Sequence, residues 1–158
     1  MTDPLKTTGP KPYLLKRRDA AQKTLDRFEG SAFNWSSNDC MRLAACHARN
    51  LGHKVPVPKA GAYRDPKGAL RHLRQLTGAP RIERALDQYF EPIPPAFAVT
   101  GDIIAMPSAD GEEWPAIFIM LDNGRALGFI EVPDGPTVCM VATPIPERIS
   151  LAWRVEPL

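Results

Sequence analysis

Three closely spaced prolines, Pro92, Pro94 and Pro95, divide the chain into two parts with different hydrophobic patterns. Proline cannot continue a helix, because it lacks the backbone N–H and its ring clashes with the preceding turn. Upstream of the prolines, apolar residues recur at helical spacing; downstream, they fall in short runs that are typical of strands. This order predicts an α+β fold in which N-terminal helices pack on a C-terminal antiparallel β-meander.

Four helices are expected before the prolines, over residues 13–29, about 40–51, 66–77 and 81–90. In the first of them, we expect Leu14 on the apolar face and the run Lys16 to Asp19 facing outward. Ser37, Asn38 or Asp39 can cap the second helix. The first three helices are each followed by a glycine, a common helix stop.

Five strands are expected after the prolines, over residues 102–106, 116–121, 125–130, 137–141 and 152–155. The sequence Asp122-Asn123-Gly124 predicts a tight hairpin turn between the second and third of these strands.

The length of 158 residues fits one domain. Residues 1–12 are polar and contain prolines, so we interpret them as an extended N-terminal arm, followed by a single domain over residues 13–158. The N-terminus lacks the apolar core of a signal peptide, and no apolar stretch is long enough to span a membrane. We therefore expect a protein that is made in the cytoplasm and does not insert into a membrane by itself.

Charge is distributed unevenly along the chain. Residues 1–90 contain 17 Lys/Arg and 8 Asp/Glu, whereas residues 91–158 contain 3 and 10. Such asymmetry is compatible with a basic face for a polyanion or an acidic partner. It is also compatible with two halves that attract each other, or with neighbouring subunits that meet head to tail. The basic residues do not cluster with aromatic residues, so binding to nucleic acid is not expected.

The three cysteines are Cys40, Cys46 and Cys139. Their odd number and their spacing fit neither a disulfide framework nor a metal-binding knuckle, so no cofactor or metal is expected. A metal or iron–sulfur site built from all three stays an alternative that would need ligands from a partner chain. Cys46 and Cys139 fit small apolar core positions.

Cys40 is the candidate nucleophile, because it directly follows the residues that can cap a helix. Free N–H groups and the partial positive charge at a helix N-terminus stabilise a thiolate and can lower the pKa of a cysteine.

The segment Phe33-Asn34-Trp35, followed by Asp39-Cys40 at a helix start, resembles the nucleophile segment of NlpC-type cell-wall cysteine peptidases. Gly101-Asp102 resembles the entry into the first central strand of those enzymes, and residues 115–124 resemble the strand and hairpin that follow.

A closer resemblance, over roughly residues 14–155, is to a family of small phage proteins related to these peptidases and encoded among tail genes. It includes Tyr63-Arg64, Ile93-Pro94-Pro95-Ala96 and the terminal Ala152-Trp153-Arg154-Val155. The resemblance implies a papain-like fold with Cys40 in the nucleophile position.

The sequence departs from the peptidase pattern where the catalytic base belongs. A histidine opens the second strand in the peptidases, whereas Trp114, Pro115 and Ala116 occupy the matching positions here. None of these three side chains can accept a proton. We therefore expect Cys40 to be a vestigial nucleophile with no histidine partner.

The chain has three histidines elsewhere. His47 lies seven residues after Cys40 on the same helix, about 10 Å along the axis, so it cannot reach the thiol. His53 and His72 are expected at the surface.

The remaining candidates have ordinary structural roles available. Glu112-Glu113 fits a solvated turn rather than a metal site, and Asp102 fits a capping or pairing residue at a strand start. Trp35, Trp114 and Trp153 are spread along the sequence and fit core or interface positions. Candidate interface anchors are Tyr13, Trp153 and the basic helical face Arg71, Arg74, Arg81 and Arg84.

Two functions stay open. The first is a structural component of a bacteriophage tail tip or baseplate, present in the virion in multiple copies and bound to other tail proteins such as a hub or distal tail protein. The second is an active cysteine hydrolase that cleaves peptidoglycan cross-links during phage entry, with its base supplied by a rearranged His53 or His72.

Overall fold

The four expected helices form, and two of them have carboxylate caps. They are α1 (Tyr13–Phe28), α2 (Cys40–Asn50), α3 (Pro66–Thr77) and α4 (Ile82–Tyr89). The Asp39 side chain accepts a hydrogen bond from the backbone N of Arg42 at the start of α2, and Asp65 does the same for Gly68 in α3. Helix α3 ends at Gly78, whose φ of 75° is the left-handed conformation that glycine adopts without strain.

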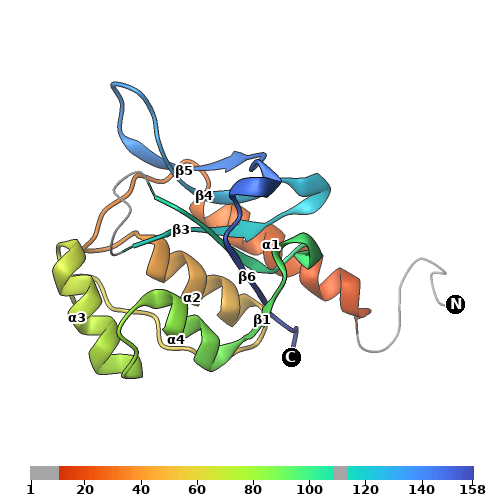
Figure 1. The fold of residues 1–158 in the computed structure, drawn as a ribbon, viewed down its shortest axis with the longest axis horizontal. Coiled ribbons are helices and arrows are strands. Elements are labelled where there is room, and N and C mark those ends of the chain that lie inside the picture. Colours follow the sequence, from red (N-terminus) through yellow and green to blue (C-terminus); the bar gives the residue numbers. More distant parts are fainter. Residues whose placement is uncertain (1–10, 109–113) are drawn as a thin grey trace, which may run out of the picture.

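The computed structural model describes residues 11–108 and 114–158 and contains a six-stranded antiparallel sheet. Its strands are β1 (Glu91–Ile93), β2 (Ile103–Met106), β3 (Ala116–Met120), β4 (Ala126–Glu131), β5 (Thr137–Ala142) and β6 (Leu151–Arg154), in the spatial order β1-β6-β2-β3-β4-β5. Helices α1 and α2 pack on one face of the sheet, and α3 and α4 lie beside α2 (Figure 1). The mixed α+β class is therefore confirmed.

The predicted meander is wrong at both of its ends. Strands β2 to β5 follow one another as expected, but β6 returns to pair with β2 instead of β5. A further strand, β1, pairs with β6 at the sheet edge, where Pro92 stands opposite Trp153. The prolines argue against a strand at this point, yet an edge strand tolerates a missing N–H.

The sheet buries apolar side chains on both faces. The larger core lies between the helices and one face and includes Leu43, Ile103, Ile119 and Trp153. The smaller core on the other face includes Ile104, Phe118 and Ala152. Gly128 in β4 is required there, because a Cβ at this position would lie 2.6 Å from the Phe118 ring.

The loop before α2 is hydrogen-bonded to the edge of the sheet. Residues 30–33 run along the outer edge of β5, where Gly30 N donates to Cys139 O at 2.8 Å and Phe33 N donates to Thr137 O at 2.9 Å. The expected hairpin between β3 and β4 is confirmed, with Asn123 and Gly124 at φ values of 60° and 72°. Among the described residues, no helix is long and apolar enough to cross a membrane.

One face of α1 differs from the prediction. Leu14 is 73% exposed, whereas Arg17 is 1% exposed and reaches into the core. Arg17 can be buried because its guanidinium forms an ion pair with Asp102, which is itself fully buried. Hydrophobic spacing could not show this, since the partner lies 85 residues along the chain.

Candidate functional site

Cys40 is the first residue of α2, as predicted, and Asp39 immediately before it caps the helix. The Asp39 carboxylate is fully buried, and its Oδ1 accepts a 2.9 Å hydrogen bond from Arg42 N. Cys40 is buried too, with 8% of its surface exposed. The nucleophile position therefore lies at a helix N-terminus but has little access to solvent.

Arg42 holds this region together through its guanidinium group. Its Nη1 donates to Asp39 Oδ2 at 2.8 Å and to the carbonyl oxygen of Trp35 at 3.1 Å. The same side chain donates to the carbonyl oxygens of Pro58 and Lys59 at 3.1 and 2.7 Å. One buried cation thus connects the helix cap with the aromatic turn before Cys40 and with the loop after α2.

Tyr63 completes the hydrogen bonding of Asp39. Its hydroxyl donates to Asp39 Oδ2 at 2.6 Å, and its ring lies 4.7 Å from the Arg42 guanidinium carbon. Burial raises the pKa of the Asp39 carboxyl, and the hydrogen bond from Tyr63 is the largest effect that lowers it. Burial also raises the pKa of Tyr63, with the Asp39 charge acting in the same direction, so the phenol is the donor.

A position at the helix N-terminus does not give Cys40 a lowered pKa. Burial raises the pKa of the Cys40 thiol strongly, and the nearby Asp39 carboxylate raises it further. The helix N-terminus supplies only about half a positive charge, and the carboxylate that caps the helix cancels that field at short range. The thiol is therefore protonated at neutral pH and is a poor nucleophile.

Trp114, the residue that the resemblance to the peptidases aligns with their histidine, is nearly buried. It is 9% exposed, and its Nε1 donates to the carbonyl oxygen of Pro66 at 3.2 Å. Its ring centroid is 5.3 Å from that of Trp35, which in turn packs against Phe33 at 5.0 Å and Tyr63 at 6.4 Å. Trp35 and Trp114 are distant in the sequence, but they form one aromatic cluster beside the start of α2.

Each of the three histidines contacts groups other than the Cys40 thiol. His47 is fully buried, with Nε2 at 2.7 Å from Gly101 O and Nδ1 at 2.7 Å from the Thr24 hydroxyl. His53 Nε2 donates to the carbonyl oxygen of Glu156 at 2.6 Å. The His72 ring packs against Tyr63 at 5.5 Å. His53 and His72 are half-buried, so the prediction that they are surface residues is wrong in part.

The other cysteines occupy the core positions predicted for them. Cys46 and Cys139 are 5% and 0% exposed, and all three thiols are free. Within residues 11–108 and 114–158, no group of three or more His, Cys, Asp or Glu side chains could hold a metal ion.

Asp102 is the pairing residue that its place at the strand start suggested. Its carboxylate accepts from Arg17, from Arg154 Nε at 3.0 Å and from the backbone N of Val99 at 3.0 Å. This network joins α1, β2 and β6 inside the molecule. Sequence reasoning missed both arginines, because nothing in the local pattern marks Arg17 as buried or Arg154 as a partner of Asp102.

Trp153 cannot serve as the interface anchor that was expected. It is 1% exposed, and its Nε1 donates to Asp87 Oδ1 at 2.8 Å. Tyr13 is 46% exposed and stays a candidate. In the predicted basic face, Arg71 and Arg74 are exposed, whereas Arg81 is half-buried and pairs with Glu83.

Two sequence predictions lie outside the described residues. They are the arm, of which the structure describes only Lys11 and Pro12, and the pair Glu112-Glu113.

The chain matches the family described as "Domain of unknown function (DUF6950)" over residues 15–155. Because the match covers most of the chain, the protein belongs to this family. Comparison with curated proteins found no match. Comparison with solved structures found none either.

Proposed function

We propose that this chain is a structural component of a bacteriophage tail tip or baseplate, built on a papain-like, NlpC-type fold that has lost its catalytic pair. The main support for a loss of catalytic activity is the environment of Cys40. Its thiol is 8% exposed, and its pKa is raised by burial and by Asp39. The resemblance aligns Trp114, which cannot accept a proton, with the base of the peptidases.

Cysteine-peptidase chemistry needs a thiolate, a base within hydrogen-bond reach and an acid for the leaving amine. The buried, protonated Cys40 does not supply the first. The three histidines, whose ring nitrogens or ring faces engage other groups, do not supply the others. A scaffold that keeps the helix and sheet of a peptidase while burying its thiol suits a structural role.

The assignment to a phage tail is supported by the order of the sequence motifs, from Phe33-Asn34-Trp35 to Ala152-Trp153-Arg154-Val155. The uneven charge of the two halves and the exposed Tyr13 at the start of the domain suit a subunit held between neighbours.

The alternative is an active hydrolase that takes its base from a rearranged His53 or His72. Of these two, His72 contacts a residue that binds next to Cys40. The His72 ring touches Tyr63, whose hydroxyl binds Asp39 next to Cys40. Catalysis would require this imidazole to replace Tyr63 beside the thiol, which would break the 2.6 Å hydrogen bond to Asp39.

Two measurements on the full-length protein test the proposal. We expect co-purification with tail proteins from the same genome and no turnover of peptidoglycan peptides, with Cys40→Ala behaving like the wild type. Turnover that Cys40→Ala abolishes would support the hydrolase. A protein that stays monomeric at low salt and binds none of the tail proteins would contradict the structural role.

A further inference from the structure

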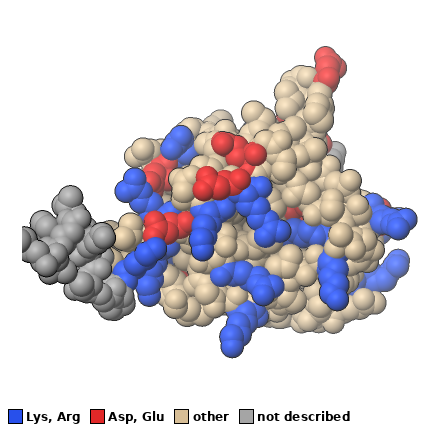
Figure 2. All heavy atoms as spheres, turned by 180° about the vertical axis from the view of Figure 1, so that it is seen from behind, with Lys and Arg blue, Asp and Glu red and all other residues tan. Residues whose placement is uncertain are grey.

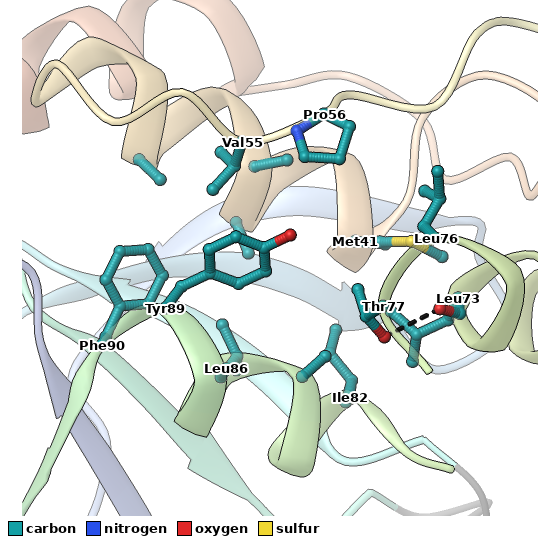
Figure 3. A pocket seen from close by; sticks show the side chains of 14 residues that line it. Met41, Val55, Pro56, Leu73, Leu76, Thr77, Ile82, Leu86, Tyr89 and Phe90 are labelled. Carbon is teal, nitrogen blue, oxygen red and sulfur yellow. Dashed lines mark hydrogen bonds between the residues drawn. The ribbon is translucent and has the colours of Figure 1, made fainter. Parts of the chain in front are cut away.

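An apolar groove lies between three helices, on a side of α2 that does not include Cys40. Met41 and Ala45 of α2, Leu73 and Leu76 of α3, and Ile82 and Tyr89 of α4 are among the residues that line it. Figure 3 shows these helices surrounding an open centre toward which Met41, Ile82 and Tyr89 project. Leu76 and Tyr89 are each 41% exposed, so the groove presents apolar surface to solvent.

The walls of the groove restrict the form of an occupant. These walls are mainly helical, with Val55 and Pro56 of the loop after α2 completing them. Helix backbones have no free N–H or C=O groups along their length, so they offer no edge to which an extended peptide could add a strand. An occupant must satisfy its own backbone hydrogen bonds, and a helix does so. An amphipathic helix that places one apolar face in the groove would contact α2, α3 and α4 together, as a fourth helix of a bundle.

The elements that frame the groove are strongly basic. Residues 40–90, which include α2, α3 and α4, contain ten Lys/Arg and three acidic residues. Asp65 caps α3, and Glu83 and Asp87 pair with Arg81 and Arg84. Arg42 is buried against Asp39. The other seven are exposed, and none forms an ion pair within the described part of the chain: Arg49, Lys54, Lys59, Arg64, Lys67, Arg71 and Arg74. In Figure 2, which shows the molecule from behind, the lower part carries Lys and Arg side chains.

We infer that this groove is a docking site for an acidic amphipathic helix of a partner protein. The apolar stripe of the helix would fill the groove, and its Asp and Glu residues would meet unpaired cations on α2, α3 and the loop between them. Apolar contact supplies most of the affinity of such a complex, and charge complementarity sets orientation and association rate. The site is separate from the Cys40 site and does not depend on the tail assignment.

The test uses fluorescence anisotropy with the full-length protein and a labelled synthetic helix of about 18 residues, with a leucine stripe and glutamates on its other faces. Two control peptides accompany it: one has the same composition with the stripe scrambled, and the other has lysines in place of the glutamates. We expect binding of the acidic amphipathic peptide, weaker binding of both controls, and an affinity that falls as salt rises.

Variants test the apolar groove and the positive charge around it separately. Ala45 is half-exposed in the groove, so Ala45→Trp fills it without disturbing the core and should weaken binding by about tenfold or more. Ala60→Trp, at an exposed loop position outside the groove, is the matched control and should bind like the wild type. Combined Lys54→Glu, Arg71→Glu and Arg74→Glu should reverse the preference toward the lysine peptide. Circular dichroism and thermal melting confirm that each variant folds.

Three outcomes would overturn the inference. One is that the acidic peptide does not bind, or binds equally to the wild type and Ala45→Trp. Another is dimerisation of the wild type in sedimentation that Ala45→Trp abolishes, which would assign the groove to a second copy of this chain. The last is that single-stranded DNA binds as tightly as the peptide and is unaffected by Ala45→Trp, which would make the surface a general polyanion site.

Discussion

The Tyr63 hydroxyl donates a 2.6 Å hydrogen bond to Oδ2 of Asp39, the residue directly before Cys40. Asp39 also caps α2 and pairs with Arg42, so one buried carboxylate connects the helix start, the loop after α2 and the aromatic cluster. A carboxylate used in this way is a structural element. It fills the space beside the thiol with negative charge, which opposes formation of a thiolate.

Tyr63→Phe removes this hydrogen bond and leaves the ring in place. A buried charged acceptor that loses one donor destabilises the native state, so we expect the free energy of unfolding to fall by about 1–3 kcal/mol. Urea denaturation followed by circular dichroism measures the change. Tyr89→Phe, at a residue that is 41% exposed, is the control and should change stability by less than about 0.5 kcal/mol. Equal losses of unfolding free energy in the two variants would show that the Tyr63–Asp39 hydrogen bond stabilises the fold no more than an exposed hydroxyl does.

Asp102→Asn removes the charge that compensates Arg17 and Arg154. The Arg17 side chain is 1% exposed, so the variant leaves a buried guanidinium without its counter-charge. We expect a loss of about 3–5 kcal/mol, measured by denaturant unfolding. The matched control is Asp19→Asn, which breaks an exposed pair with Lys11 and should cost less than about 1 kcal/mol. An Asp102→Asn variant as stable as Asp19→Asn would refute the role given to the network.

The sequence alone predicts helices α1 to α4 and strands β2 to β6, but it does not predict β1 or every strand pairing. Helix caps, glycine stops and the Asn123-Gly124 turn are local signals, and α1, α2, α3 and the β3–β4 hairpin lie where those signals put them. The pairing of β6 with β2 depends on contacts between residues far apart in sequence, such as Ile103 with Trp153, and no local pattern encodes it.

The candidate site, too, could be predicted from the sequence only in part. The position of Cys40 at a helix start follows from the capping residues before it, and the absence of a histidine near Trp114 is visible in the sequence. The direction in which the pKa of Cys40 shifts cannot be read from the sequence. It depends on how deeply the fold buries the thiol and on the charge of Asp39. Burial of Arg17 was missed for a similar reason, since its carboxylate partner lies 85 residues further along the chain.

His47 predicts a specific dependence of stability on pH. Burial lowers its pKa from 6.5 to about 4, so the folded state holds a neutral ring, and Nε2 donates to Gly101 O. Between pH 6.5 and about 4 the unfolded chain takes up a proton that the folded chain does not. The contribution of His47 to stability is therefore complete above pH 6.5 and is lost as pH falls toward 4, by up to about 3 kcal/mol.

His47→Gln tests this dependence by removing the titrating group. Its free energy of unfolding, measured in urea at several pH values, should change less between pH 6.5 and 4 than that of the wild type. Asp39 has a raised pKa and acts in the opposite direction, but it is present in both proteins and cancels in the comparison. Identical slopes for the two proteins would exclude His47 as the source.

The buried thiols predict that the native protein is inert toward thiol reagents. Burial raises the pKa of Cys46 and raises that of Cys139 to about 12, and burial and Asp39 together raise that of Cys40. With 5,5′-dithiobis(2-nitrobenzoate) at about pH 8, the native protein should react more than about a hundredfold more slowly than glutathione, since reaction requires local opening. In urea, all three cysteines should react. One rapidly reacting equivalent in the native protein, absent from Cys40→Ala and retained in Cys46→Ala, would instead mean that Cys40 is accessible and activated. That result would contradict the environment described for the thiol and would favour the hydrolase over the structural role.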